Sequence, residues 1–227
     1  MVKQVLFSYT GHKQPKEIKL FDKYLTDINK YNIIIEPFCG HFGFSTYYSD
    51  KFKGNYVFND NNKILIDIFN DVKAGNIKDY IDIINTFKNT NTYKGKTYIN
   101  TFKKLDNGKR ETFQFKDLLK DLDLKDKHDY VLYKKFCNYN RLFHKIKNDV
   151  NEETYKYLVD ILNKSTLTCG DFKDCINKYK DDEKALIYLD PPYFQSSNLD
   201  YDTYVGNKTH DENKNVIDYT GIYILKY

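Results

Sequence analysis

Apolar residues follow a helical period near the N-terminus and then form short uninterrupted runs. From Gln14 to Lys30 they recur every three or four positions, which predicts a helix with one apolar stripe. That stripe consists of Ile18, Phe21, Tyr24, Leu25 and Ile28. Residues 32–36 then form a short apolar run that ends at Pro37, as expected of a strand buried on both faces of a parallel sheet.

The next segment repeats the change from strand to helix. A glycine-containing loop leads into a helix through Tyr48, and residues 55–58 form a second apolar run. Another helix is predicted from Asn61 to Val72, with its apolar residues on one side. Strands that alternate with helices in this way are typical of a doubly wound, mostly parallel α/β sheet.

This rhythm stops after about Asn85 and returns near Leu167. Residues 91–115 are rich in Thr, Tyr and Lys and contain Asp106-Asn107-Gly108, a typical hairpin turn. The remaining predicted elements are helices over 128–147 and 151–163, strands over 166–169 and 185–189, and one more strand within 221–225. We therefore expect one α/β domain built from residues 1–84 and 165–227, with residues 85–164 inserted as a second domain.

Composition indicates a folded protein. Hydrophobic residues make up 41% of the 227, which argues against disorder. No apolar run approaches the length of a membrane span, and no charged-then-apolar leader is present. The four cysteines have no Cys-x-x-Cys spacing, so neither a metal site nor a disulfide framework is expected. We expect a soluble, cytoplasmic protein without a membrane partner.

Positive charge is concentrated in the middle of the chain. Between Lys94 and Lys147 there are 15 Lys or Arg against 7 Asp or Glu, although the whole chain has a net charge of only +4. A basic segment within an acidic frame favours contact with a polyanion. A solvated lysine-rich surface is the alternative.

The sharpest chemical signal is Asp190-Pro191-Pro192-Tyr193, directly after the apolar residues 185–189. Ligands of open α/β sheets bind at the carboxyl ends of strands, where this tetrapeptide falls. The prolines fix the backbone and remove two N–H donors, so that a carboxylate and a carbonyl can accept both hydrogens of one amino group. The Tyr193 ring could stack on a planar base. A proline-rich turn without catalytic function is the alternative.

This tetrapeptide resembles motif IV of amino-methyltransferases, in particular the Dam-like DNA adenine-N6 methyltransferases. The resemblance implies a Rossmann-like S-adenosylmethionine-dependent methyltransferase fold and a flipped-out adenine whose amine is held by Asp190 and Pro191. It also implies that S-adenosylmethionine is the cofactor and double-stranded DNA the partner. Asp190 and the next three residues, Pro191, Pro192 and Tyr193, would then be the catalytic set, and Asp190 would also contact the cofactor.

Further segments match this family in the expected order. Residues 7–13 are similar to an N-terminal motif whose backbone and lysine meet the methionine part of the cofactor, residues 36–40 to its Glu-Pro-Phe-x-Gly loop, and residues 58–61 to its second-strand segment. Residues 170–172 are similar to the element that contacts the cofactor adenine. The implied cofactor-binding residues are Tyr9, Gly11, Lys13, Glu36, Pro37, Phe38, Gly40, Asp60, Asp171 and Phe172.

Each of these residues also has a plainer interpretation. Lys13 could be solvated, Gly40 could end a turn, and Asp60 or Asp171 could cap the following helix. The loop also departs from the family in one place. Family chains carry a second glycine two residues after the first, where this chain has Phe42, and Gly43 follows one step later.

The inserted segment lies where Dam-like enzymes carry their DNA-reading domain, which gives residues 85–164 a target-recognition role. The residues expected to contact DNA are Lys103, Lys104, Lys109, Arg110, Lys134, Lys135, Asn140 and Arg141. Phosphate contacts of this kind make affinity fall steeply with salt.

Family chains continue after motif IV with several strands and a helix, whereas this sequence ends at Tyr227. A compact variant, a truncated product and one half of an enzyme completed by a separate polypeptide all remain open. Besides DNA adenine methylation, two functions therefore stay as alternatives: a pseudoenzyme that binds cofactor or DNA without turnover, and an RNA adenine methyltransferase.

Overall fold

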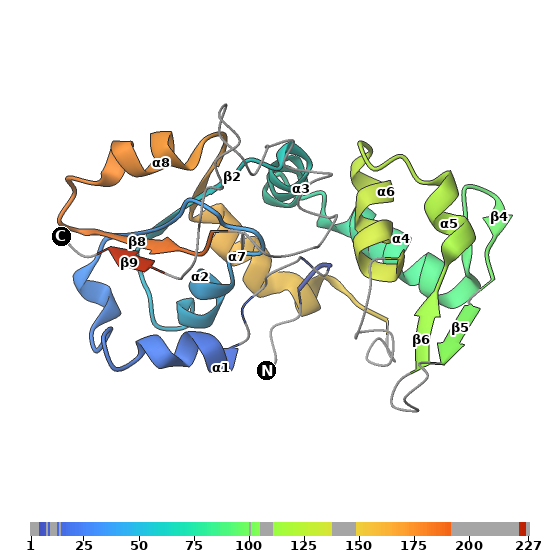
Figure 1. Cartoon of the computed structure of the whole chain (residues 1–227), viewed down its shortest axis with the longest axis horizontal. Coiled ribbons are helices and arrows are strands. Elements are labelled where there is room, and N and C mark those ends of the chain that lie inside the picture. The colour runs from blue at the N-terminus through green and yellow to red at the C-terminus, as the bar shows by residue number, and fades with distance from the viewer. Residues whose placement is uncertain are drawn as a thin grey trace, which may run out of the picture. The chain divides into compact units, whose positions relative to one another are not determined.

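The computed structural model describes residues 5–7, 9, 13, 15–99, 101–104, 111–137, 149–191 and 223–225 (Figure 1). The chain divides into two compact units. Tyr9–Asn70 and Leu158–Tyr227 form the first, which we call the sheet unit. Met1–Ser8 and Asp71–Tyr157 form the second, which we call the helix-hairpin unit.

A five-stranded sheet lies at the centre of the sheet unit, in the order β7-β2-β1-β8-β9. Its first four members are mutually parallel, and β9 pairs antiparallel with β8. The strands are β1 (Ile33–Glu36), β2 (Asn55–Asp60), β7 (Ser165–Cys169), β8 (Ala185–Leu189) and β9 (Tyr223–Leu225). All five predicted strands are therefore confirmed.

The register of these strands brings the predicted polar residues to one edge. Glu36 pairs with Phe58, and Asp60, two residues further along β2, pairs with Cys169. Asp190 follows directly after β8. Because the carboxyl ends of parallel strands share one edge of the sheet, segments that are far apart in sequence converge there.

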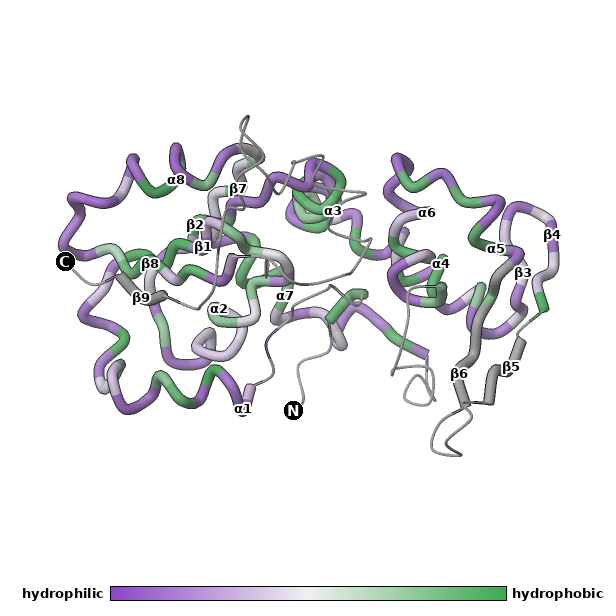
Figure 2. The backbone as a smooth tube through the Cα atoms, in the orientation of Figure 1, coloured by the Kyte–Doolittle hydropathy of each residue, from purple (hydrophilic) through white to green (hydrophobic). Residues whose placement is uncertain are grey.

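Helices cover both faces of the sheet (Figure 1). On one face, α8 (Phe172–Tyr179) packs Cys175 against Ile35, Val57 and Ile187, and Figure 2 shows α8 alternating between hydrophobic and hydrophilic residues. On the other, α2 (Gly43–Tyr48) packs Phe44 flat on Tyr188, with ring centroids 4.3 Å apart. Two covered faces explain why the strands are apolar runs and not alternating sequences.

The loop that enters β2 requires a glycine. A β-carbon at Gly54 would lie 2.2 Å from the Asn32 carbonyl oxygen, far inside van der Waals contact. That same oxygen accepts the Asn55 N–H at 3.0 Å, so β1 and β2 begin their pairing at this close approach.

The predicted helix from Gln14 to Lys30 is only partly right. The chain forms α1 (Pro15–Ile18), continues as 3₁₀ turn η1 (Lys19–Phe21), and forms a separate 3₁₀ turn, η2 (Ile28–Lys30). Asp27 caps that turn by accepting the Asn29 N–H at 3.0 Å. A local cap of this kind competes with a continuous helix, which explains the break.

The helix-hairpin unit has an aromatic core. Phe87 lies on α4 (Ile77–Thr90), and its ring is 4.9 Å from those of Phe115 and Phe136. The remaining elements are α5 (Lys116–Asp121), α6 (Lys127–Leu132), the π-helical turn η3 (Tyr133–Cys137), η5 (Glu152–Tyr155), the start of α7 (Lys156–Asn163), and the end of α3 (Lys63–Lys73). Sequence patterns did not predict α4, since its polar residues hide the apolar stripe.

Two antiparallel hairpins belong to this unit: β3 (Thr92–Tyr93) with β4 (Lys96–Thr97), and β5 (Thr101–Lys104) with β6 (Glu111–Gln114). The second flanks the predicted turn at residues 106–108, which itself lies outside the described residues. The first was not predicted. Lys94 and Gly95 both have positive φ, as a two-residue hairpin turn requires. The part of the predicted 128–147 helix after Cys137 lies outside the described residues.

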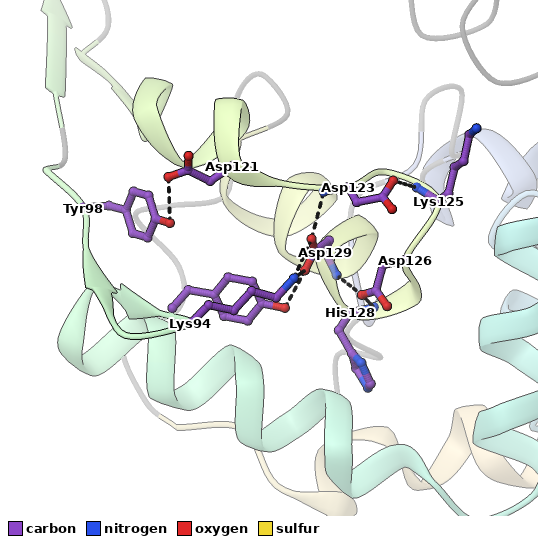
Figure 3. A network of polar contacts seen from close by, with 9 residues as sticks. Lys94, Tyr98, Asp121, Asp123, Lys125, Asp126, His128 and Asp129 are labelled. Atoms are coloured by element: carbon purple, nitrogen blue, oxygen red, sulfur yellow. Dashed lines mark hydrogen bonds and ion pairs between the residues drawn. The ribbon is translucent and has the colours of Figure 1, made fainter.

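A buried carboxylate organises the first hairpin (Figure 3). Asp129 has no exposed side-chain surface. It accepts the Tyr93 hydroxyl at 2.5 Å, the Lys94 ammonium at 3.0 Å and the Asp123 N–H at 2.8 Å. Burial alone would raise the pKa of Asp129, but these donors outweigh it and lower the pKa. The charge is therefore compensated by a local, structural network.

None of the helices that can be described has both the length and the apolar character needed to cross a membrane.

Candidate functional site

The loop after β1 is built around Gly40, which has a φ of +45°. Its N–H donates to Asp60 Oδ2 at 3.0 Å, while Asp60 Oδ1 accepts the Asn62 N–H at 2.9 Å. A β-carbon at Gly40 would lie 3.1 Å from the Tyr9 ring. Only glycine therefore combines this backbone conformation with close packing of Tyr9. The contacts bring residues 9, 40 and 60 together.

Glu36, the last residue of β1, is buried and accepts the Ser45 N–H at 2.8 Å. Ser45 lies in the first turn of α2, whose N-cap residue, Phe42, provides no side-chain hydrogen bond. Glu36 therefore supplies the cap from a strand end. Burial raises the pKa of Glu36 to about 8, and the nearby negative charge of Asp190 adds to this, although the Ser45 bonds oppose it.

Phe42 adopts a left-handed backbone conformation, with φ of 37° and ψ of 51°. Its ring stacks on Phe58 at 4.5 Å and meets the edge of Phe69 at 4.9 Å. For a residue with a β-carbon this conformation costs about 1–2 kcal/mol. Phe42 thus forms the turn where the resemblance to Dam-like enzymes predicts a glycine, and its aromatic packing offsets the strain.

Two aromatic rings face each other across the loops after β1 and β7. The Phe38 and Phe172 centroids are 4.7 Å apart, and both rings are half-buried. Asp171, between β7 and α8, is exposed and caps α8 by accepting the Lys173 N–H at 2.7 Å. The plainer interpretation of Asp171, a helix cap, therefore describes its side-chain contact in this structure.

An ion pair joins the first and second sequence segments of the sheet unit. Lys13 Nζ lies 2.7 Å from Asp190 Oδ1, and the two side chains are only 10% and 16% exposed. Burial raises the pKa of Asp190, while the hydrogen bond and charge of Lys13 lower it. Lys13 therefore helps to keep the Asp190 carboxyl group ionised in a site that water reaches poorly. Pro191, the next residue, is buried.

The chain matches a known protein family over most of its length. Residues 9–220 match the family model of the D12 class N6 adenine-specific DNA methyltransferases. The chain belongs to this family. It is an enzyme that methylates adenine in DNA, as the motifs predict, and members of such families use S-adenosylmethionine. A comparison with curated proteins found no match.

Eleven of the fourteen residues predicted to be catalytic or to bind the cofactor lie in the described part of the sheet unit of this D12 class methyltransferase. They are Tyr9, Lys13, Glu36, Pro37, Phe38, Gly40, Asp60, Asp171, Phe172, Asp190 and Pro191. Gly11, Pro192 and Tyr193 lie outside the described residues, as do Lys109, Arg110, Asn140 and Arg141. Lys103 and Lys104 lie on β5, where the backbone is described and the side chains are not.

Two predicted DNA contacts do not agree with the structure. Lys134 is only 2% exposed, and its ammonium lies over the rings of Tyr130 and Tyr133. Lys135 donates to the Leu6 carbonyl at 3.0 Å, and burial lowers its pKa to about 8. Both lysines lie in the π-helical turn η3, and their ammonium groups bind partners inside the helix-hairpin unit. Neither is retained as a phosphate contact.

Sequence reasoning missed Asn59 and the conformation of Phe42. Asn59 falls within the second-strand segment 58–61, but the sequence pattern assigns it no role, since its bonds reach residues 22 and 111 positions away. The positive φ of Phe42 could have been inferred from its place in the loop. Within the described residues, no three His, Cys, Asp or Glu side chains gather as a metal site would require.

Proposed function

We propose that Asp190 and Pro191 hold the adenine amine for direct methyl transfer. Asp190 Oδ1 is bound to Lys13, so we assign Oδ2 and the Pro191 carbonyl to the two amine hydrogens. Accepting both hydrogens draws the nitrogen lone pair out of conjugation with the ring and aims it at the electrophile. Positioning and electrostatics supply most of such a rate enhancement. The Lys13–Asp190 pair is the observation on which this assignment depends.

The cofactor supplies an electrophilic methyl group on a sulfonium. Residues at the strand ends fit its adenosine part. Asp60 is a carboxylate at the end of the second strand, a natural acceptor for ribose hydroxyls, and two of its lone-pair positions are taken by Gly40 and Asn62. Phe38 and Phe172 offer ring faces to a purine. The close backbone at Gly40 lets the loop approach a bound molecule.

For Glu36 we propose an indirect role, since its carboxyl group is buried against α2. It fixes the position of the helix that follows the cofactor loop. Lys13, in contrast, can contact both Asp190 and the methionine end of the cofactor, because a lysine ammonium has three donors.

We further propose that the helix-hairpin unit binds the phosphates of double-stranded DNA. The excess of positive charge between Lys94 and Lys147 lies wholly in this unit. Lys103, Lys104, Lys109, Arg110 and Arg141 remain candidate phosphate contacts, and Asn140 remains a candidate DNA contact. Affinity for duplex DNA should then fall with salt, each phosphate contact adding about one unit to the slope of the log–log plot.

The catalytic assignment is tested by methylation with radiolabelled S-adenosylmethionine and duplex DNA. Wild-type protein should label adenine, and Asp190→Ala should lower kcat by at least about 10²–10³-fold. Asp182→Ala is the matched control, because Asp182 precedes the same strand at its opposite end and its side chain accepts the local Lys184 N–H. It should keep normal activity.

Labelling that persists at the wild-type rate in Asp190→Ala would contradict the role of Asp190. Structured RNA, used as a competitor, should inhibit less than duplex DNA. Cofactor binding without methylation of either nucleic acid would contradict the proposed catalytic geometry.

A further inference from the structure

Asn59 lies at the end of β2 with all its side-chain hydrogen-bonding groups engaged. Its Nδ2 donates to the Pro37 carbonyl at 3.0 Å and to the Gly170 carbonyl at 2.9 Å. Its Oδ1 accepts the Thr168 hydroxyl at 2.9 Å. The side chain is 3% exposed, so these bonds form away from water.

One carboxamide therefore connects the segments on either side of its own strand. Pro37 belongs to the loop after β1, and Gly170 to the loop after β7. The Asn59 main chain adds a fourth bond, because its carbonyl accepts the Cys39 N–H at 2.8 Å. The two loops are held to β2 at points 22 and 111 residues away from Asn59 in sequence.

The two residues whose carbonyls bind Asn59 are close in sequence to the proposed cofactor contacts. Phe38 follows Pro37 directly, and Phe172 is two residues beyond Gly170. Their rings lie 4.7 Å apart. Asp60, the proposed ribose acceptor, is the next residue after Asn59. A change in the Asn59 bonds would therefore move the two rings relative to each other and to the Asp60 carboxylate.

We propose that Asn59 is a positioning residue that sets the spacing of the Phe38 and Phe172 rings and so determines the affinity for the adenosine part of the methyl donor. This inference rests on the proposed function, which puts the adenosine at these rings. Asn59 itself does not touch the reacting atoms.

The chemistry of the site requires an amide. Two carbonyls and one hydroxyl surround the side chain, so it must offer two donors and one acceptor within one planar group. An aspartate keeps the acceptor but, when ionised, presents oxygen to both carbonyls. An alanine leaves both carbonyls without this partner, and buried carbonyls that lose a partner are costly.

The experiment measures S-adenosylmethionine and S-adenosylhomocysteine binding by calorimetry in the full chain. Asn59→Ala should weaken both ligands by about tenfold or more, which corresponds to about 1.4 kcal/mol. Once cofactor is saturating, kcat and the KM for duplex DNA should stay within about threefold, because Asp190 and Lys13 are unchanged. Thr168→Val is the control. It removes the hydroxyl donor but keeps both amide–carbonyl bonds, so binding should change by less than about threefold.

A conservative variant tests the donor requirement separately. Asn59→Asp should weaken binding at pH 8 and recover part of the affinity as the pH falls, because the protonated acid regains one O–H donor. Wild-type protein measured over the same pH range accounts for the titration of Asp60. A structural role without positioning would show no such recovery.

Circular dichroism and the thermal midpoint identify variants that do not fold. If Asn59→Ala does not fold, the cofactor affinity of Asn59→Asp at low pH tests the inference in its place. An unchanged cofactor affinity in folded Asn59→Ala, or an equal loss in Thr168→Val, would overturn the inference. The quantity that decides this test is the affinity for the cofactor, which does not require methyl transfer. Wild-type protein that binds S-adenosylmethionine without methylating DNA would therefore contradict the catalytic assignment and leave the Asn59 test intact.

Discussion

Each unit contains an aspartate with little or no exposed surface, and the two carboxyl groups have opposite pKa shifts. Asp129, in the helix-hairpin unit, has three strong donors from residues within 36 positions of it, and its pKa is lowered. Asp190, in the sheet unit, has one cation from 177 positions away, and its pKa is raised. Burial raises the pKa of both groups. The three donors at Asp129 outweigh this effect, whereas Lys13 at Asp190 does not. The negative charge of Glu17 also raises the pKa of Asp190.

This difference agrees with a structural role for Asp129 and with the ligand-binding role that we propose for Asp190. The Asp129 charge is compensated within the protein, so nothing is gained by a further partner. Asp190 is incompletely compensated and lies at a strand end beside a fixed carbonyl, where an amine can complete its bonding. Incomplete compensation in such a place is a feature of functional sites.

In the sheet unit, the packing of Phe42 against Phe58 and Phe69 gives the largest expected effect on stability. Phe42→Ala should lower the free energy of unfolding by about 4 kcal/mol, since a buried aromatic side chain is removed. Phe42→Gly should cost about 1 kcal/mol less, because glycine adopts the positive φ without strain. Urea denaturation measures both. A glycine variant no more stable than the alanine variant would show that the conformation is not strained.

The helix-hairpin unit depends on its polar network instead. Asp129→Ala should lower the free energy of unfolding by about 3 kcal/mol, because the Tyr93 hydroxyl and the Asp123 N–H lose a buried partner. Urea denaturation followed by far-UV circular dichroism measures this loss. Asp117→Ala, which breaks an exposed pair with Lys120, is the control and should change little. Methylation by the folded Asp129 variant at the wild-type rate would support the distinction from Asp190.

Glu36 provides a pH test within the sheet unit. Its pKa rises from an ordinary 4.5 to about 8 on folding, so the stability that its neutral form contributes is complete below pH 4.5 and is lost as the pH rises to about 8. Glu36→Gln keeps the acceptor for the Ser45 N–H and cannot ionise. Its free energy of unfolding should equal that of wild type at pH 4 and exceed it by a growing margin as the pH rises to 8.5. Denaturation midpoints of both proteins, measured across this pH range, test the prediction. A difference between Glu36→Gln and wild type that does not change with pH would contradict it.

The smallest effect is expected from Lys13→Met. Removing the cation takes away the interaction that lowers the pKa of Asp190, so that pKa should rise further. The acid limb of the kcat–pH profile, measured at saturating cofactor, should then move to higher pH. Lys16→Met, at a neighbouring exposed lysine, should leave the profile unchanged. An unmoved acid limb in Lys13→Met would mean that Lys13 serves the cofactor alone.

Local sequence patterns predicted β1 and β8 because each is a short apolar run, and they placed Asp190 at a strand end because β8 precedes it directly. They could not predict which buried lysines serve the interior, as Lys134 and Lys135 do, since that depends on the π-helical turn. They also could not show that Asn59 joins two distant loops. Such contacts depend on register, which the alternation of residue types along one strand does not reveal.

The close approach at Gly54 has a consequence for how this protein can change. Because β1 and β2 start their pairing against the Asn32 carbonyl, a side chain at position 54 would push β2 along its neighbour. A slip of one residue turns every side chain of a strand to the opposite face. A slip towards the carboxyl end would put Asn59 where Asp60 now lies and Phe58 where Asn59 now lies, so neither the amide nor the acid would keep its present contacts. Gly54, just before β2, thus constrains which residues can occupy the opposite end of that strand.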